Sequence, residues 1–405
     1  MMQSRAHGGI IFLFVIALAD AISFSVWQSV IASIHPVYVT LTSTTLDALA
    51  VNMYQGVLFS AAFILCFWIG YLSDRSHCVR LLRYCLLVLM LGYILLLCEV
   101  KFGFKEITLV DGVIFCFIAI FTSAHYCILT LCVYIAINNI DCQNTRLDQG
   151  YLIAIIFIST YSVYRIFSSL LLHFRSMFSL STLVFAAVIL IFIAYFICFL
   201  LRCNIQSNIS KAKKSKMLAS FLLANLSLFK NRNFVYIIIS AVLFYQVVGI
   251  STGLMIDFYT SMPYPLSVIL LIQIAINVLM FLSAFTIYPV IIKIFSPQKV
   301  NYVAFCITVS FCILFKVLSI IGAELAAIIV YPVILWFGML ALTTYLPLLY
   351  QHEKRKMGMS FGVYYAITLV TWPLVYTYYN LGIGLLLCVL VLLAVLNILA
   401  IRSLS

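Results

Sequence analysis

The stretch Gly70–Arg80 reads GYLSDRSHCVR and is one of the few strongly polar passages in an otherwise apolar chain. Asp74 and Arg75 stand side by side within it, and the apolar stretches 48–72 and 81–98 flank it. A helix needs roughly 20 mostly apolar residues to cross a bilayer. The passage is therefore predicted to be a short charged loop between two membrane spans.

The composition of the whole chain agrees with a membrane protein. Of its 405 residues, 66% are hydrophobic and 8% are charged, whereas soluble domains are about 45–50% apolar and about 25% charged. The 13 cysteines lie mostly inside apolar runs and lack the spacing of a disulfide framework or a zinc site. We therefore predict an all-α polytopic membrane protein with no metal and no cofactor.

Polar gaps and gaps marked by proline or glycine divide the chain into twelve expected spans. They run over 8–34, 48–72, 81–98, 111–136, 150–172, 181–202, 233–258, 266–292, 299–321, 324–350, 358–380 and 381–402. The first of them is longer than the apolar core of a signal peptide and lacks a small-residue cleavage site, so we expect it to stay in the membrane.

The basic residues predict the orientation of these spans. If both termini are cytoplasmic, 18 of the 23 lysines and arginines lie in cytoplasmic segments, and only Lys101, Lys105 and Arg175 lie outside. Cytoplasmic loops of membrane proteins carry such an excess. The net charge of +12 is thus interpreted as an orientation signal in the plasma membrane (the inner membrane of a bacterium), not as a nucleic-acid surface.

The longest loop divides the chain in the middle. Residues 203–232 are polar and basic, with four lysines between Lys211 and Lys216. We interpret the loop as a cytoplasmic linker between a six-helix half over 1–202 and a six-helix half over 233–405. Two such halves are typical of secondary transporters. The lysines are attributed to orientation and to contact with anionic lipids.

The charged loop of the opening passage resembles a known signature. Gly70, three residues, then Asp74 and Arg75 are similar to the sequence between spans 2 and 3 of the major facilitator superfamily. His77 stands where a second glycine is usual, and the basic residues that follow are displaced to Arg80 and beyond. Weaker echoes are Arg146 with Gly150 after span 4, and EKRKMGMSFG at 353–362 after span 10.

The resemblance implies two pseudo-symmetric six-helix bundles that work by alternating access. It also implies a conformational gate on the cytoplasmic side, made of Gly70, Asp74, Arg75, Arg80, Arg146, Arg355 and Gly358. The alternative interpretation is a basic loop that only fixes topology.

Charged residues within spans usually mark a pathway. Asp20 lies near the middle of span 1, with Ser23, Trp27 and Gln28 on the same helical face. A carboxylate at this place could carry a proton. The alternative is a structural aspartate bonded between helices.

Arg165 in span 5 shares a polar stripe with Tyr161 and Tyr164. Counted from the cytoplasmic ends, Arg165 and Asp20 differ in depth by roughly 5 Å. Arg165 is therefore a candidate partner for Asp20 or a candidate for anion recognition. Lys316 in span 9 is expected to reach the membrane surface with its flexible stem.

Uncharged polar residues add to this pathway. The complete set of candidates for solute and proton is Asp20, Gln28, Asn52, Gln55, His125, Tyr161, Arg165, Gln246, Gln273 and Asn277. Hydrogen bonding between helices is the alternative role for each asparagine and glutamine.

The predicted function is secondary active transport of a small polar solute, with anions among the candidates, by proton symport. The acid of span 1 followed by IHPVY resembles the metabolite–proton symporter branch. A drug or metabolite efflux antiporter is an alternative, although the glycine–proline motif of span 5 and the arginine of span 4 are missing. A non-transporting solute sensor is another.

The chain has no phosphate-binding loop and no catalytic motif, so we expect no enzyme. The expected partners are the solute, protons and the bilayer, with a monomer and no nucleic acid.

Overall fold

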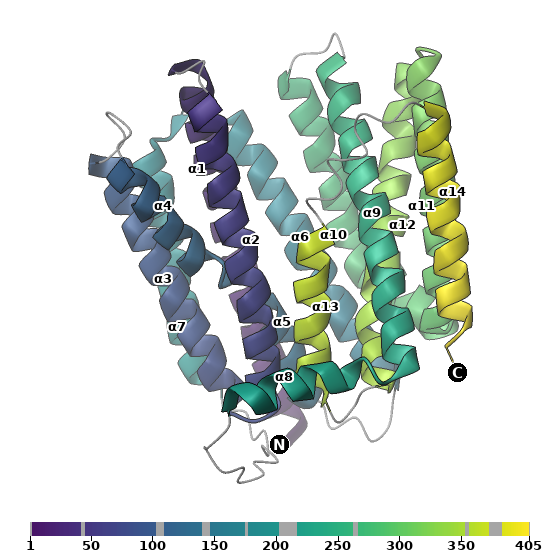
Figure 1. Cartoon of the computed structure of the whole chain (residues 1–405), viewed down its shortest axis with the longest axis horizontal. Coiled ribbons are helices and arrows are strands. Elements are labelled where there is room, and N and C mark those ends of the chain that lie inside the picture. The colour runs from purple at the N-terminus through teal and green to yellow at the C-terminus, as the bar shows by residue number, and fades with distance from the viewer. Residues whose placement is uncertain are drawn as a thin grey trace. The chain divides into compact units, whose positions relative to one another are not determined.

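A computed structural model describes residues 2–41, 45–102, 109–139, 146–174, 177–201, 217–261, 266–352, 356–371 and 383–404. These residues form fourteen α-helices (Figure 1). The helices are α1 (Met2–Leu41), α2 (Thr45–Ser73), α3 (Cys78–Phe102), α4 (Leu109–Thr122), α5 (His125–Asn139), α6 (Arg146–His173), α7 (Leu180–Leu200), α8 (Met217–Leu228), α9 (Arg232–Ser261), α10 (Leu266–Ile294), α11 (Pro297–Ile320), α12 (Glu324–His352), α13 (Met357–Thr371) and α14 (Ile383–Arg402).

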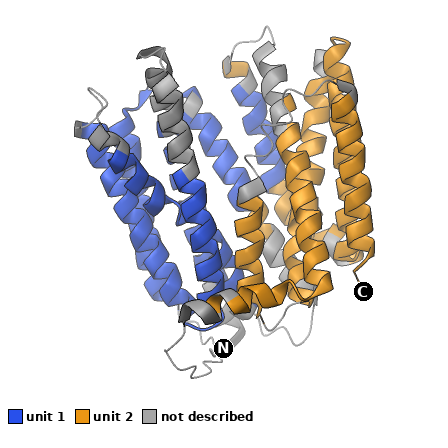
Figure 2. Ribbon diagram, in the orientation of Figure 1, with its two compact units in different colours: residues 1–141, 159–212, 270–281 blue, residues 142–158, 213–269, 282–405 orange. Residues whose placement is uncertain are grey.

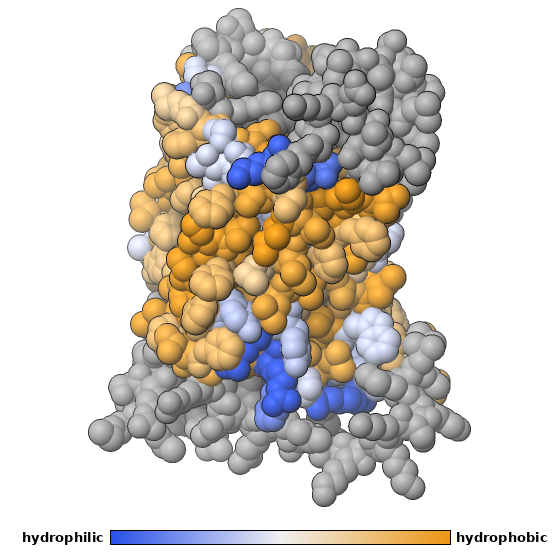
Figure 3. Space-filling view, turned by 90° about the vertical axis from the view of Figure 1, so that its left-hand side faces the viewer, coloured by the Kyte–Doolittle hydropathy of each residue, from blue (hydrophilic) through white to orange (hydrophobic). Residues whose placement is uncertain are grey.

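The number of membrane spans agrees with the sequence. Among the described residues, nine helical stretches are long and apolar enough to cross a membrane. Three shorter apolar helices, Val57–Ser73, Ile155–Leu171 and Met357–Leu369, bring the total to the twelve expected. On the face that carries α3 and α7, apolar residues form a band with hydrophilic residues toward both ends (Figure 3). The prediction of an all-α twelve-span membrane fold is confirmed.

Span 4 differs from the expected continuous helix over 111–136. It is split into α4 and α5 at Ser123 and Ala124. At the break, the Ala124 amide donates to the carbonyl of Phe121, three residues back, at 3.2 Å. The hydroxyls of Thr122 and Ser123 donate to carbonyls of the preceding turn. Hydroxyl side chains are one way in which a broken helix satisfies its backbone in the membrane. His125 thereby becomes the first residue of α5.

The linker over 203–232 also differs from the expectation of a plain loop. Residues 217–228 form α8, which has the sequence MLASFLLANLSL. The basic residues before it had suggested a loop of uniform polarity, but this segment is largely apolar. A short turn, in which the Asn231 amide donates to the carbonyl of Leu228 at 3.0 Å, separates α8 from α9.

The helices group into two compact units (Figure 2). Unit 1 comprises residues 1–141, 159–212 and 270–281, and unit 2 comprises 142–158, 213–269 and 282–405. In unit 1, α1 and α3 both pack against α7, and α5 packs against α1 and α3. In unit 2, α11 packs against α12, and α9 packs against α12, α13 and α14. The division of the chain into two repeats at the linker stays a prediction.

A buried polar network holds unit 2 together. The Ser240 hydroxyl lies 2.9 Å from that of Tyr345 and donates to the Asn397 side-chain oxygen. The Asn301 amide donates to the Thr344 hydroxyl at 2.8 Å, and the Asn397 amide donates to the Asn301 oxygen at 3.4 Å. These side chains are buried, so the network connects α9, α11, α12 and α14. Hydrogen bonds of this kind hold membrane helices together.

A close approach in unit 1 depends on a glycine. A Cβ atom added at Gly92 of α3 would lie 2.9 Å from the Cβ of Phe121 and 3.2 Å from the Cγ2 of Thr122. Both contacts involve the last turn of α4, so α3 passes directly against the break in span 4. Only glycine leaves room for this packing.

We therefore expect Gly92→Ala to destabilise the protein, because the Phe121 Cβ cannot move without its backbone. Overpacking of this kind costs about 1–3 kcal/mol. Gly338→Ala on α12 is the matched control, since its added Cβ would meet nothing closer than 3.8 Å. The control should be neutral or gain about 0.5–1 kcal/mol from lower chain entropy. Thermal unfolding in detergent micelles measures both, and equal melting temperatures would contradict the close packing at Gly92.

Candidate functional site

The centre of the candidate site is a buried pair of ionisable side chains. Asp20 lies on α1 and His125 on α5, and their exposed fractions are 5% and 4%. The Nδ1 atom of His125 is 2.5 Å from Oδ1 of Asp20. Both residues were candidates from the sequence, and the structure brings them together in one ion pair. Burial without a partner would be costly for either group.

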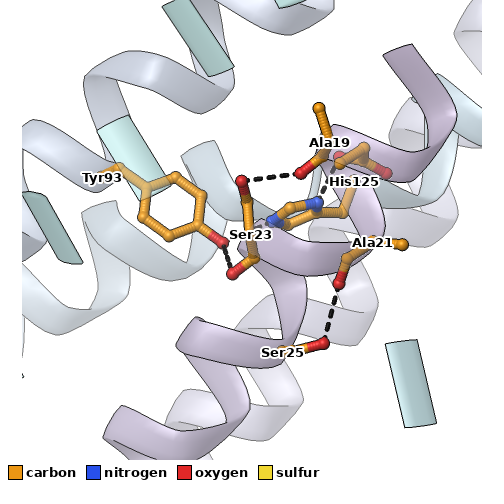
Figure 4. A network of polar contacts seen from close by, with 7 residues as sticks. Ala19, Ala21, Ser23, Ser25, Tyr93 and His125 are labelled. Atoms are coloured by element: carbon orange, nitrogen blue, oxygen red, sulfur yellow. Dashed lines mark hydrogen bonds and ion pairs between the residues drawn. The ribbon is translucent and has the colours of Figure 1, made fainter. Parts of the chain in front are cut away.

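A tyrosine completes the arrangement. The hydroxyl of Tyr93 on α3 lies 2.9 Å from Nε2 of His125 and 2.5 Å from the backbone carbonyl oxygen of Ser23 on α1. Figure 4 shows Tyr93 and His125 approaching α1 at Ser23. Tyr93 and Ser23 are fully buried. Sequence reasoning missed Tyr93, although the residue before it, Gly92, is a small residue of the kind found where membrane helices approach closely.

The hydrogen bonds determine where the protons are. A carbonyl oxygen can only accept, so the Tyr93 hydroxyl donates its single hydrogen to Ser23. The Tyr93 oxygen must then accept from His125, which means that Nε2 carries a hydrogen. A second hydrogen lies between Nδ1 and the Asp20 oxygen, because two bare lone pairs would repel at 2.5 Å. The pair therefore holds two hydrogens, and its net charge is zero wherever the second one sits.

Loss of one proton would change this bonding in a defined way. The pair would become a carboxylate that accepts from Nδ1–H of a neutral imidazole, with a net charge of −1. Nε2 of His125 would then be an acceptor, and the Tyr93 hydroxyl would have to turn its hydrogen from Ser23 to Nε2. The charge state of the pair on α1 and α5 is thus coupled to a hydrogen bond made by α3.

The aromatic ring of Phe24 packs against His125 and against two tyrosine rings. The Phe24 ring lies 4.9 Å from the His125 ring, 5.9 Å from the Tyr126 ring and 5.2 Å from the Tyr164 ring, measured between centroids. The Ser25 hydroxyl donates to the carbonyl of Tyr164 at 2.9 Å, which connects α1 to α6. The surroundings are apolar enough to strengthen every electrostatic interaction within the pair.

The expected pairing of Asp20 with Arg165 is wrong. The only ion pair of Asp20 in the described part of the chain is with His125. Arg165 is half-buried on α6, next to Tyr164. The error has a physical cause: equal depth along two helices says nothing about the direction in which each side chain leaves its helix.

The solute candidates lie in both units. In unit 1, the Ser169 hydroxyl of α6 donates to Oε1 of Gln273 at 3.4 Å, and the Asn277 amide donates to the Gln273 carbonyl at 2.6 Å. Tyr161 on α6 is half-buried. Gln246 on α9 is buried in unit 2. The side chains of Gln28, Asn52 and Gln55 lie outside the described residues.

Several of these groups have unmet hydrogen-bonding capacity. Among the described residues, the buried side-chain oxygens of Gln246 and Asn277 have no hydrogen-bond partner, and neither do the buried hydroxyls of Ser159 and Ser162 on α6. Buried polar atoms are nearly always bonded, so exceptions call for an explanation. A polar solute or water that binds to these atoms would satisfy them.

The residues of the charged loop differ in their contacts and in their exposure. Asp74 accepts a hydrogen bond from the Tyr134 hydroxyl of α5 at 3.1 Å. The Arg75 guanidinium lies over the Tyr71 ring, 3.8 Å from its centroid, and Arg80 is exposed. Sequence reasoning missed Tyr134, which looks like an ordinary residue of a membrane span.

The remaining gate candidates are less informative. Gly70 and Gly358 are buried, whereas the side chain of Arg146 and all of Arg355 lie outside the described residues. Arg83, the other basic residue of this region, donates from Nη2 to the Cys198 carbonyl at 3.1 Å. It therefore caps the carboxyl end of α7. A cation is favourable at that end of a helix.

The described residues contain no group of three or more histidine, cysteine, aspartate or glutamate side chains that could hold a metal ion. The described cysteines form no disulfide among themselves. The thiols of Cys66 and Cys127 approach within 3.9 Å between α2 and α5.

No family model and no curated protein matches the sequence. Solved structures match over nearly the whole chain. The human organic anion transporter MFSD10 (TETRAN) is 13% identical, with a TM-score of 0.68 and 99% of both chains covered. FucP, the fucose:proton symporter of E. coli, in its outward conformation is 13% identical, with a TM-score of 0.71 and 98% of both chains covered.

The proton:xylose symporter XylE bound to 6-bromo-6-deoxy-D-glucose is similar too. It is 11% identical, with a TM-score of 0.74, and the match covers 100% of this chain and 97% of that one. FucP and XylE are major facilitator superfamily transporters. The fold defined by the twelve spans is therefore that of membrane transporters. In particular, it is the major facilitator fold that the loop at Gly70–Arg80 had suggested.

The Asp20–His125 pair should behave as one energetic unit. Asp20→Ala and His125→Ala should each lower the free energy of unfolding, because removal of one partner of a buried pair costs about 3–5 kcal/mol. The double variant should cost less than the sum by about 0.5–3 kcal/mol. Unfolding in mixed micelles measures these values.

The control cycle combines Asp20→Ala with Arg165→Ala. Its effects should add to within about 0.5 kcal/mol, as they do for residues that share no interaction. A large coupling in this control, together with additive effects for Asp20 and His125, would overturn the assigned pair.

Proposed function

We propose that the protein is a secondary active transporter that moves a small polar solute across the plasma membrane by alternating access, driven by proton symport. The observation that carries the proposal is the buried Asp20–His125 pair at the break of span 4. Ionisable groups are rare within membrane spans and mark proton and solute pathways. The fold supports transport, because the similar structures include two proton symporters and an organic anion transporter.

In this proposal, the pair is the proton-binding site. Its neutral state holds the transported proton, and its −1 state is left after release. One charge moving through 100 mV supplies about 2.3 kcal/mol, enough to concentrate a solute about fiftyfold. The buried oxygen of Asn277 and the stripe of Tyr161 and Arg165, all in unit 1, are the proposed solute contacts, and Arg165 would favour an anionic group.

The orientation in this proposal is that of the sequence analysis, with both termini cytoplasmic. It places the loop of Asp74 on the cytoplasmic side. Efflux by antiport with protons would use the same site in the opposite direction. Transport assays distinguish the two, because protons move in the same direction as the solute in symport and in the opposite direction in antiport.

The proton role is tested by Asp20→Asn in proteoliposomes, with a panel of radiolabelled sugars and organic anions as solutes. A pH gradient, acidic outside, should drive the parent to accumulate its solute, because each solute enters with a proton. Asp20→Asn should lose this accumulation yet retain exchange of labelled for unlabelled solute, since exchange needs no net proton release.

Glu99→Gln is the matched control. Glu99 is also buried, but it lies six residues beyond Tyr93 on α3, about 9 Å along the helix. The control should accumulate solute like the parent. Proton-driven accumulation by Asp20→Asn at the parental level would contradict the proposed proton site.

The gate is tested by Tyr134→Phe and Asp74→Asn. We expect both to slow turnover more than they change the affinity for solute, because the bond between the two residues stabilises one conformation of the transporter and not the solute site. One hydrogen bond to a charged group is worth about 1.5–3 kcal/mol, which corresponds to a change of about tenfold or more in the conformational equilibrium. Parental turnover in both variants would leave the loop as a topology signal only.

A further inference from the structure

The segment that sequence analysis had taken for a linker carries an apolar face with no place in the transport mechanism. On α8, the side chains of Leu223 and Leu226 are 68% and 62% exposed, and Phe229 in the following turn is 41% exposed. Leu223 and Leu226 are three residues apart and so lie on one side of the helix. Large apolar side chains that are grouped on a surface usually mark an interaction site.

The opposite side of α8 is buried within the protein. Phe221, Asn225 and Leu228 are buried, and the Asn225 amide donates to the carbonyl of Phe221 at 3.0 Å. The helix is therefore apolar on both sides. A helix that is apolar all round is normally buried in apolar surroundings. The exposed side of α8 is therefore expected to contact apolar groups and not water.

The position of α8 limits what this cover can be. The membrane-spanning stretch of α9 begins at Arg232, only four residues after α8 ends. The side-chain oxygen of Asn231 accepts from the Asn233 amide at 3.0 Å and fixes the corner. Within unit 2, α8 runs crosswise to α9 and α13 at their ends (Figure 1). A helix that runs crosswise at the ends of membrane spans has the geometry of a helix that lies along the membrane surface.

A second contact holds the helix there. The ammonium group of Lys356 donates to the Ser227 hydroxyl at 2.7 Å. Lys356 directly precedes α13, so the helix is connected to both α9 and α13. This connection keeps the side with Leu223 and Leu226 in one orientation relative to unit 2.

The charges next to this side indicate which lipids cover it. Lys230 and Arg232 are exposed, and the sequence before α8 adds Lys211, Lys213, Lys214 and Lys216. An apolar helical side with basic residues beside it is typical of helices that lie in an anionic membrane surface. Clusters of lysine and arginine next to a membrane bind anionic headgroups.

We propose that α8 is a membrane-surface helix, with Leu223, Leu226 and Phe229 inserted among the acyl chains and with Lys230 and Arg232 bound to anionic phospholipid headgroups. The inference goes beyond the proposed transport function and does not depend on it. It assigns to unit 2 a lipid-binding site that is held against α13 by Lys356.

The test uses a photo-crosslinking amino acid, benzoyl-phenylalanine, in place of Leu226 in the full-length protein. The protein is reconstituted in vesicles of equal amounts of phosphatidylcholine and phosphatidylglycerol, irradiated and analysed by mass spectrometry. The control carries the same probe at Gln351, which is exposed at the end of α12. The two probes lie at the same end of unit 2, because Nδ1 of His352 lies 3.1 Å from the side-chain nitrogen Nδ2 of Asn233 on α9.

We expect the probe at position 226 to capture lipid and the probe at position 351 to capture little. The captured lipid should be mainly phosphatidylglycerol, by about fivefold for each basic residue that contacts it. The double substitution Lys230→Gln and Arg232→Gln should bring the two lipids close to parity while capture itself continues. Both residues are exposed, so folding should be unaffected, and a probe at Leu223 repeats the test on the same side of α8.

Three results would contradict the proposal. If the probes at 226 and 351 capture equal amounts of lipid, the exposed side of α8 is not in the membrane. If the main product at 226 joins two copies of the protein, the face is an interface between protomers. If the protein with Lys230 and Arg232 intact captures phosphatidylcholine and phosphatidylglycerol equally, these two residues do not bind anionic headgroups. None of these results depends on transport activity.

Discussion

The constraint on which this structure depends is the high cost of an unsatisfied polar group inside a bilayer. Asp20 and His125 satisfy each other by a hydrogen bond, and Tyr93 is the hydrogen-bond partner of the second ring nitrogen of His125. The carbonyl of Ser23 then receives the only hydrogen that Tyr93 can give. Four groups on three helices are thus satisfied in a closed set, and a change in the protonation of one must change the bonding of the others.

The packing around this set follows from the same constraint. His125 reaches α1 from the first position of α5, immediately after the break in span 4. Gly92 allows α3 to pass directly against the end of α4, and the next residue is Tyr93. The helix break, the close approach and the hydrogen bonds therefore form one connected arrangement. Half-helices that begin in mid-membrane are a recurring way to build sites in transporters.

The sequence could predict those features that the bilayer itself determines. Its thickness sets the length of a span, so hydropathy located the twelve spans and the loop at Asp74. Hydropathy does not give the rotation of a helix about its axis, and for that reason Arg165, and not His125, was a candidate partner of Asp20. The hydrogen-bond network of Asn301 and Asn397 was not predicted for a similar reason, because such a prediction requires knowing which helices are neighbours. The helix α8 was not predicted, because the basic residues before 217 made the whole linker look polar.

The polar networks of the two units differ in a way that bears on their roles. In unit 2, Asn301, Asn397 and their neighbours are amides and hydroxyls, which keep the same charge near neutral pH. In unit 1, the network contains a carboxyl and an imidazole, both of which are ionisable groups. A network of neutral groups has the same hydrogen bonds throughout the proposed transport cycle, whereas in that cycle the hydrogen bonds of unit 1 would differ before and after proton release. In the proposed cycle, proton binding would therefore act on the contacts between α1, α3 and α5 and leave those between α9, α11, α12 and α14 unchanged.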